Sequence, residues 1–474
     1  MDDEFLENPK ADYTPWRPDH ANYPDGKGAL YDQVRKAPLR DYGTDRQTLT
    51  AMYHSREFAD LEWQRLWKTT WLIVGHVNDV PRENCFMKVD LGKESFLIVR
   101  GEGEELRGMY NVCQHRGTRL VTQDFGSTRK FVCPFHQWEF ANDGRLTQVA
   151  KQETFRKAAL CHDLDLPKIR VESWRGWIFI NLDLEAAPLL DWIPEDFRSL
   201  FDAYDLEKMV RVVDKTQEWD INWKAAVEAF IEGYHVEAVH PQLNPYFDSY
   251  HNQHDLYDNG FARSIFPFMI PMPTRKAYAR TELSEEAKLF MREAGLGEDE
   301  FPATDSEARA KVLEGKRRNQ GRIGMDYSRF TDEQLVDDWN VGIFPCCSWN
   351  LHPEGLLVQR WWPHAKDPGK MVYYYQVYAM PGMKEMPTYM GVPPGFDTSG
   401  RKVLARFSCE KGDLEPLGSV LSQDAVFLPR LQQGIESDGF RGAVYSEQEV
   451  RLRQMQDEIF KKLKIDPASW RPKD

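Results

Sequence analysis

The sequence predicts an α+β protein in which an all-β domain precedes a larger domain of antiparallel strands covered by helices. Short β-prone segments separated by turns fill residues 70–182, and strands and helices mix from about residue 205 onward. The strand-like segments within 339–380 are joined by links too short for parallel crossovers. With 41% hydrophobic and 13% aromatic residues, the 474-residue chain can fill the cores of two to three domains.

The N-terminal part, residues 1–69, is expected to form an arm and a helix that pack on the larger domain. Residues 10–45 are rich in Pro, Asp, Gly and Tyr, which is typical of an extended arm. Residues 55–68 carry apolar side chains at near-helical spacing, and Ser55 can cap their first turn.

The all-β domain is expected to span residues 70–185, with a hairpin turn at Asp143-Gly144. A Pro-rich and acidic stretch at 186–197 predicts a linker, and residues 186–474 are assigned to the second domain. Within it, residues 219–241 have helical periodicity, and the charged residues 282–320 predict exposed helices. Ser446 and Glu449 form a capping box for a last helix that runs through Lys464.

Charge and cysteine usage exclude some classes of protein. The net charge of −14 argues against a nucleic-acid partner. Apolar runs are far shorter than a membrane span, and the acidic N-terminus is unlike a secretion signal. Seven cysteines, an odd number, do not suggest a disulfide framework. These features predict a cytoplasmic protein whose patterned cysteines bind metal.

Two matched pairs of metal-ligand residues stand in turns at predicted strand ends. Cys113 and His115 form a C-x-H pair, Cys133 and His136 form a C-x2-H pair, and seventeen residues lie between the pairs. Chance, a structural zinc site and a Rieske 2Fe–2S cluster are the competing interpretations. Zinc fingers usually pair Cys with Cys and His with His. In a Rieske cluster one iron takes two Cys and the other two His, so each loop must reach both irons.

The segments CQHRG and CPFHQWEF resemble the Rieske signature of the ring-hydroxylating oxygenases. The resemblance implies that Cys113 and Cys133 hold the buried iron of the cluster. It also implies that His115 and His136 hold the outer iron, from which electrons leave.

A second group of candidate ligands lies in the segment EGYHVEAVHP. His235 and His240 would diverge on an ideal helix, but Pro241 disfavours helical geometry at His240 and lets it turn toward His235. Glu228, Glu232 and His235 would share one stripe of a continuous helix. Two histidines and one carboxylate form the facial triad of non-haem Fe(II) oxygenases.

The same family has an acidic residue-x2-His-x4-His motif, which Glu232, His235 and His240 match. By this resemblance the two histidines bind mononuclear iron, and LSQDAVFLPRLQQG places Asp424 as the third ligand. The family usually has Asp where this chain has Glu232. In the family, the carboxylate at this position carries electrons between a Rieske His of one subunit and an iron-bound His of the next. The family often has Asn where this chain has Ala229.

The resemblance implies the large (alpha) subunit of a Rieske non-haem iron oxygenase, with a helix-grip catalytic domain. A reductase, with or without a ferredoxin, would pass NAD(P)H electrons to the cluster, and O2 would be the co-substrate. A homotrimer or an α3β3 ring would bring the cluster of one subunit to the iron of the next. The expected reaction is hydroxylation of an aromatic ring.

Several alternatives stay open at this stage. Glu232 slightly favours the alternative substrate class, a quaternary ammonium or a methoxy or methylamine compound that is demethylated. A Rieske electron carrier without mononuclear iron and a zinc-stapled binding module are further alternatives. Cys346 and Cys347 are predicted to be a buried structural pair. The candidate pocket residues are Phe230, Val236, Val239, Phe344 and Trp349.

Overall fold

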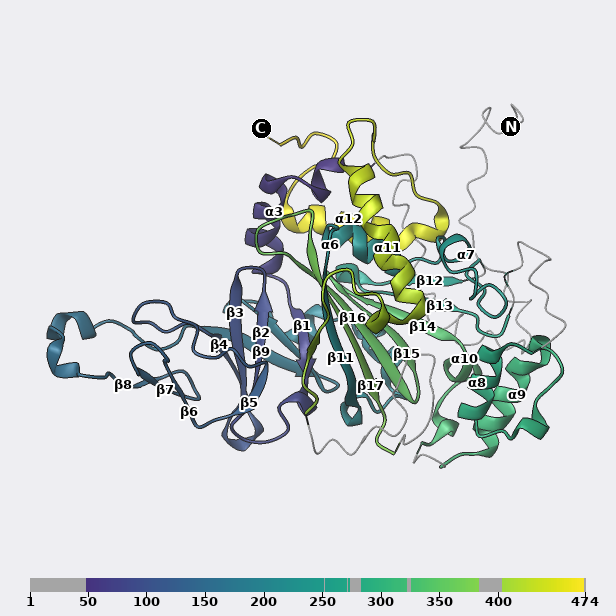
Figure 1. The fold of residues 1–474 in the computed structure, drawn as a ribbon, viewed down its shortest axis with the longest axis horizontal. Helices are drawn as coiled ribbons and strands as arrows, with labels where there is room; N and C mark the ends of the chain where they lie inside the picture. Colours follow the sequence, from purple (N-terminus) through teal and green to yellow (C-terminus); the bar gives the residue numbers. More distant parts are fainter. Residues whose placement is uncertain are drawn as a thin grey trace.

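Two large antiparallel sheets and the helices around them make up the described part of the chain (Figure 1). In this computed structural model, the described residues are 48–250, 252–270, 272, 283–321, 325–382 and 403–472. The arm predicted over residues 10–45 lies outside them. None of the described helices is both long enough and apolar enough to cross a membrane.

The first helix of the described chain follows a short turn, η2 (Thr50–Tyr53). Helix α3 (Arg56–Glu62) is capped by the Ser55 hydroxyl, which accepts a hydrogen bond from the Phe58 amide at 3.3 Å. The helix continues as a π-helical turn, η3 (Trp63–Trp67), so the helix predicted over 55–68 is confirmed. The Trp67 ring lies edge-on to Trp223 with centroids 4.9 Å apart, which packs this helix on the larger domain.

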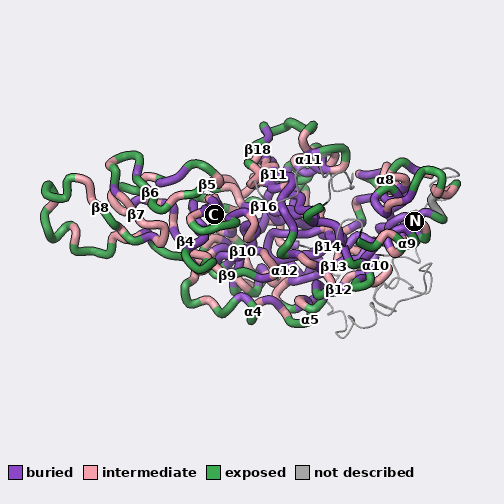
Figure 2. The backbone as a smooth tube through the Cα atoms, turned by 90° about the horizontal axis from the view of Figure 1, so that it is seen from below, coloured by how far each residue is buried: buried purple, intermediate pink, exposed green. Residues whose placement is uncertain are grey.

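The smaller domain contains a seven-stranded sheet and a three-stranded sheet. The seven strands, in the order β1-β10-β9-β4-β3-β2-β5, are β1 (Leu72–His76), β2 (Cys85–Leu91), β3 (Glu94–Arg100), β4 (Leu106–Tyr110), β5 (Phe125–Ser127), β9 (Lys168–Trp174) and β10 (Trp177–Asn181). The smaller sheet contains β6 (Lys130–Val132), β7 (Glu139–Ala141) and β8 (Leu146–Gln148). The predicted Asp143-Gly144 turn joins β7 to β8, and Gly144 has φ +92°, which glycine adopts without strain. This small sheet projects at one end of the molecule and is largely exposed (Figures 1 and 2).

The segment predicted as a linker is instead folded into the core, so that prediction was wrong. Helices α4 (Leu189–Trp192) and α5 (Glu195–Arg198) lie there. Leu189, Ile193 and Phe197 are at most 1% exposed, so the two short helices and the residue that follows α4 pack into the core. The prolines and acidic residues that suggested a linker only start the two helices and cover their outer side.

The larger sheet has eight strands in the order β12-β13-β14-β15-β16-β17-β11-β18. The strands are β11 (Val210–Trp219), β12 (Gln253–Leu256), β13 (Ala262–Phe266), β14 (Asp338–Ile343), β15 (Cys347–His352), β16 (Gly355–Pro363), β17 (Met371–Ala379) and β18 (Phe407–Ser408). All neighbours are antiparallel except β11 and β18, so the antiparallel strands predicted within 339–380 are confirmed.

Helices gather in two groups around this sheet (Figure 1). The first group is α6 (Trp223–Phe230), α7 (Val236–Val239), α11 (Gly418–Ile435) and α12 (Val450–Leu463). The second group is α8 (Glu285–Glu293), α9 (Asp305–Arg318) and α10 (Asp332–Val336). The predicted helices of 282–320 are present, but Phe290, Met291 and Val312 bury one face of them against the core. Half of the predicted capping box forms, because the Ser446 amide donates to Glu449 at 2.7 Å just before α12.

The segment with the candidate iron ligands is a broken helix rather than a continuous one. Asn222 caps the start of α6, and the helix ends at Phe230, with Ile231 at its C-cap. Residues 231–235 are not helical, so the single stripe expected for Glu228, Glu232 and His235 does not exist. As predicted beside Pro241, His240 leaves helical geometry, with φ −120° and ψ 57°.

Candidate cluster and metal sites

The candidate cluster site is built from two loops with the same backbone turn. In the loop after β4, the Gly117 amide donates to the Cys113 carbonyl at 2.9 Å. In the loop after β6, the Gln137 amide donates to the Cys133 carbonyl at 2.9 Å. Both Gly117 (φ +81°) and Gln137 (φ +59°) adopt left-handed geometry. Each turn therefore curls around its cysteine and presents one Cys and one His to the same space.

The four candidate cluster ligands meet between these loops. The His115 and His136 rings lie 4.5 Å apart, and His115 stacks on Trp138 at 4.8 Å. Cys113 and Cys133 are 2% and 1% exposed, whereas both histidines are half-buried. The structure thus places the two cysteines inside and the two histidines toward the surface.

The donor set fits a 2Fe–2S group. The Nδ1 atoms of His115 and His136 are buried and have no hydrogen-bond partner among the described residues, which is costly unless they bind metal. Burial, with the nearby His136, lowers the pKa of His115 and so keeps its imidazole neutral and able to bind metal. Burial raises the pKa of the Cys113 thiol, so a thiolate there needs a positive partner such as iron.

The candidate mononuclear site brings together His235, His240 and Asp424. One ligand atom from each residue lies within 4.8 Å of the others. The Nε2 atoms of His240 and His235 lie 3.2 and 3.9 Å from the same oxygen of Asp424. The two ends of α7 supply the histidines, with His235 at the N-cap and His240 at the C-cap, and the buried face of α11 supplies Asp424, which is 4% exposed. Three convergent donors with space beside them fit a facial-triad iron.

A second set of side chains orients these two histidines. Glu232 lies 2.5 Å from Nδ1 of His235, and Gln423 accepts from Nδ1 of His240 at 2.8 Å. With Nδ1 occupied in both rings, both Nε2 atoms are left for a metal. Burial alone would lower the pKa of His235, but the charges of Glu232 and Asp424 raise it to about 9. Gln423 was not predicted from the sequence, because nothing in the segment around Asp424 indicates that the preceding side chain also faces the site.

A cavity of about 470 Å³ opens beside the three donors. Of the predicted pocket residues, Phe230 and Val236 line it, but Val239, Phe344 and Trp349 do not. Trp349 packs in the core against Trp177, with ring centroids 5.0 Å apart. Ala229 also lines the cavity. Five further aromatic side chains line the cavity, namely Tyr246, Phe247, Phe266, Phe268 and Tyr375. Two further carboxylates, Glu286 and Asp338, also line it.

The remaining cysteine prediction agrees with the structure. Cys346 and Cys347 are each 3% exposed, and both are free thiols. Burial raises the pKa of the Cys346 thiol and raises that of Cys347 to about 12. Both thiols are therefore protonated at neutral pH, as expected for a buried structural pair.

The smaller domain brings together two cysteines and two histidines, and the larger domain brings together two histidines and a carboxylate. This combination is that of a Rieske-type iron protein. Residues 70–168 match the family described as "Rieske [2Fe-2S] domain", and residues 206–464 match "Ring hydroxylating alpha subunit (catalytic domain)". The second match covers more than half of the chain, which therefore belongs to the ring-hydroxylating alpha-subunit family. Membership implies a Rieske cluster and a mononuclear iron as its cofactors.

Curated relatives fall into two substrate classes. The chain is 31% identical over 196 residues to the glycine betaine monooxygenase oxygenase subunit of Pseudomonas aeruginosa, covering 40% of this chain and 44% of the relative. It is 31% identical over 205 residues to the anthranilate 1,2-dioxygenase large subunit of Acinetobacter baylyi, covering 40% and 41%. It is 29% identical over 230 residues to the carnitine monooxygenase oxygenase subunit of Escherichia coli, covering 46% and 59%. The chain thus matches about half of the length of these relatives.

Solved structures share the fold along almost the whole chain. A quaternary ammonium Rieske monooxygenase aligns with a TM-score of 0.61 and 19% identity, covering 90% of this chain and 99% of that one. Naphthalene 1,2-dioxygenase from a Rhodococcus species aligns with a TM-score of 0.59 and 19% identity, covering 92% and 98%. The predicted combination of an antiparallel Rieske domain and an α+β catalytic domain is thereby confirmed.

Proposed function

We propose that this chain is the terminal oxygenase component of a Rieske non-haem iron oxygenase. The observation that carries the proposal is the convergence of His235, His240 and Asp424 beside a cavity, in a chain that also has a site of two cysteines and two histidines. Cys113, Cys133, His115 and His136 would hold the cluster, and the three convergent residues would hold the mononuclear iron. When bound, the iron would supply the O2 chemistry, and the cluster would supply electrons. A carrier protein would not need the second site.

The protein side chains would position these groups and the substrate. Glu232 and Gln423 would hold the two histidines in the tautomer that leaves Nε2 for iron. The buried faces of Phe230 and Val236 would exclude water from the cavity wall. Electrons from NAD(P)H would arrive through a reductase, with or without a ferredoxin.

For the substrate, we favour the ammonium class over an aromatic ring. Two carboxylates, Glu286 and Asp338, line the cavity together with aromatic rings such as Tyr246 and Phe247. Carboxylates and ring faces stabilise a cation, and the carnitine and glycine betaine relatives support the same class. A planar aromatic substrate is the second candidate, because Phe266 and Phe268 also line the cavity and the anthranilate relative belongs to that class.

The test is product formation by the iron-loaded protein with a surrogate reductase. Quaternary ammonium, methylamine and methoxy compounds should be demethylated with formaldehyde release, and aromatic acids should give no product. Conversion of aromatic acids alone would contradict the ammonium proposal and support the second candidate. A protein with two irons and two sulfides that stays inactive after Fe(II) addition would contradict the oxygenase proposal itself.

For the assembly, we propose head-to-tail contact between subunits, as in a homotrimer or an α3β3 ring. Figure 1 places the β6–β8 sheet far from α7 and α11 within one chain. Phe135, beside His136, is 54% exposed, and Tyr234, beside His235, is 59% exposed. Phe427 and Leu431 are also exposed on α11, the helix that carries Asp424. Docking of one surface on the other would bring the two metal sites together, and sedimentation of the purified protein tests this.

A further inference from the structure

One carboxylate that lines the cavity beside the candidate iron site is not held by any described residue. Glu232 and Asp424 face the candidate iron ligands. Asp338 accepts a hydrogen bond from Nδ2 of Asn350 at 2.7 Å. Glu286 is half-buried, and no hydrogen bond or ion pair reaches its carboxylate within the described part of the chain. A partly buried charge without a counter-charge is costly, so this carboxylate is suited to a positively charged ligand.

Helical spacing turns Glu286 toward the cavity. The Ser284 hydroxyl caps α8 by accepting a hydrogen bond from the Ala287 amide at 3.2 Å, so the helix starts just before Glu286. Phe290, one turn further on, is 3% exposed, and its ring centroid lies 5.4 Å from that of Phe268. Residues four apart share one face of a helix, so Glu286 lies on the same inner side of α8 as Phe290.

Four packed aromatic side chains line the same cavity and form what we call the aromatic wall. They are Tyr246, Phe247, Phe266 and Phe268. Phe247 stacks on Phe266 and makes a T-shaped contact with Phe268, each with ring centroids 5.1 Å apart. Tyr246 stacks on Phe268 at 6.3 Å. The faces of aromatic rings attract cations, so the wall favours a ligand of the same charge as Glu286 does.

A buried ion pair fixes the main chain of this wall. Nη2 of Arg309, on α9, lies 3.1 Å from Oδ2 of Asp337, and both residues are at most 3% exposed. Arg309 also donates to the Phe268 carbonyl at 3.1 Å, and the Phe268 amide donates to Asp337 at 3.0 Å. Together with the Phe290 contact, these bonds hold α8 and α9 against the wall. A ligand bound there would therefore need little ordering of the protein, which favours affinity.

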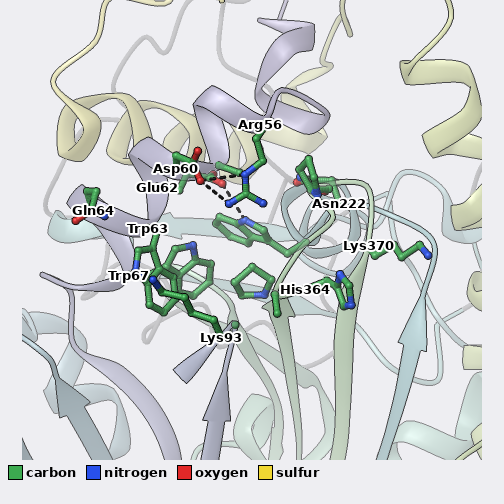
Figure 3. A pocket seen from close by; sticks show the side chains of 16 residues that line it. Arg56, Asp60, Glu62, Trp63, Gln64, Trp67, Lys93, Asn222, His364 and Lys370 are labelled. Atoms are coloured by element: carbon green, nitrogen blue, oxygen red, sulfur yellow. Dashed lines mark hydrogen bonds and ion pairs between the residues drawn. The ribbon is translucent and has the colours of Figure 1, made fainter. Parts of the chain in front are cut away.

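The charge of this cavity differs from that of another cleft, which lies between α3, the β2–β3 turn and the β16–β17 hairpin (Figure 3). That cleft, of about 330 Å³, is lined by side chains of both signs, namely Arg56, Lys93, Lys370, Asp60 and Glu62. The described residues that line the iron-site cavity include carboxylates but no lysine or arginine. The lining charges thus favour a cation in the cavity, whereas those of the cleft favour neither sign.

We propose that Glu286 selects a positively charged substrate, whose cationic nitrogen is bound between this carboxylate and the aromatic wall. The inference rests on the proposed oxygenase function and names the side chain that carries its substrate preference. Asp338 is the second carboxylate of the cavity, but Asn350 already donates to it and accepts in turn from Gln359 at 3.3 Å. Glu286 therefore carries the larger share of the preference.

The test compares two ligands of one shape in the iron-loaded holoenzyme under argon, where no turnover occurs. Choline has a trimethylammonium group, and its carbon isostere, a dimethylbutanol, has a quaternary carbon in place of the nitrogen. Calorimetry should show that the unmodified protein binds choline at least about tenfold more tightly than the isostere. E286Q should lose about tenfold to a hundredfold in choline affinity and keep its affinity for the isostere within about twofold.

Two further variants locate the effect. E285Q is the matched control, because Glu285 precedes Glu286 on α8 but is exposed and pairs with Lys288 at 2.6 Å. It should bind both ligands like the unmodified protein, and a loss equal to that of E286Q would overturn the assignment. D338N should weaken choline binding less than E286Q does, and an equal or larger loss would overturn the choice of Glu286.

Two other results would overturn the proposal, namely equal affinity of the unmodified protein for the two ligands and unchanged choline affinity in E286Q. If E286Q loses iron, E286A takes its place, and unchanged choline affinity there has the same meaning. Because binding is measured without O2, its outcome is separate from that of the proposed function. A protein that binds choline through Glu286 but oxygenates no substrate contradicts the proposed function alone.

Discussion

The two candidate metal sites are held in place by different kinds of interaction. At the cluster site, backbone turns closed by the amides of Gly117 and Gln137 set the positions of the ligands. The histidine Nδ1 atoms there have no partner in the described part of the chain. At the iron site, side chains hold the ligands, because each histidine has its own acceptor, Glu232 or Gln423. Substitutions of side chains that do not bind metal should therefore affect the iron site far more than the cluster site.

Replacing a ligand should have the largest effect and should separate the two sites. D424A removes the carboxylate shared by His235 and His240, so mononuclear iron should be lost and product formation should fall at least about a hundredfold. C133S should instead remove the cluster and leave the catalytic domain folded. Iron and sulfide analysis with electron paramagnetic resonance of the reduced protein measures both outcomes.

The expected pattern is a cluster signal that persists in D424A and mononuclear iron that persists in C133S. Loss of both metals in either variant would mean that the two sites are not independent. It would then contradict the division of the chain into two metal-binding domains.

The next largest effect is expected at Glu232. E232Q preserves the side-chain shape and one hydrogen bond to His235 but removes the charge, so both metals should stay bound. We propose that Glu232 also carries electrons between the two sites, as the family resemblance implies, so electron transfer from cluster to iron should slow by about 10-fold to 100-fold. Rapid-mixing absorption of the reduced cluster after O2 addition measures this rate. E237Q, on α7, is the control, and equal rates in E232Q and the unmodified protein would remove the bridging role.

The contrast between backbone-held and side-chain-held ligands also explains which candidate ligands could be predicted from the sequence. The ligand spacing of the cluster site lies within two short loops, so Cys113 and His136 could be assigned from local pattern and resemblance. The turn at His240 was predictable because Pro241 acts on its immediate neighbour. Asp424, by comparison, depends on α11 packing beside a segment far away in the chain, and only resemblance indicated it.

Errors arose where tertiary contacts override a local pattern. Residues 219–241 look continuously helical, yet α6 ends at Phe230. Glu228, inside α6, joins a buried network with Tyr53 and Gln456, and the break after α6 lets Glu232 reach His235. Neither partner of Glu228 is near it in sequence, so no periodicity could have indicated the network.

A smaller effect is expected at Gln423, which holds His240. Q423L keeps the side-chain size but removes the acceptor for Nδ1 of His240, so Fe(II) should bind about 10-fold to 100-fold more weakly. Competition with a chelator measures this affinity. Q242L is the graded comparison, since the Gln242 amide donates to Oε1 of Gln423 at 2.8 Å and, within the described structure, makes no hydrogen bond with the His240 ring. Wild-type affinity in Q423L would mean that iron alone orients His240.

The smallest effects are expected in the two turns of the cluster site, where the backbone does the positioning. A Cβ on Gly117 would meet no atom within 4 Å, so G117A should cost only the left-handed φ of +81°, about 1 kcal/mol of unfolding free energy. Q137G should instead raise the free energy of unfolding, since Gln137 already bears that strain at φ +59° and glycine relieves it. Thermal loss of the cluster absorption compares the two variants. If G117A instead failed to assemble the cluster at all, the turn would be constrained by more than its φ, and the cluster itself would have to approach the Gly117 backbone more closely than a Cβ allows.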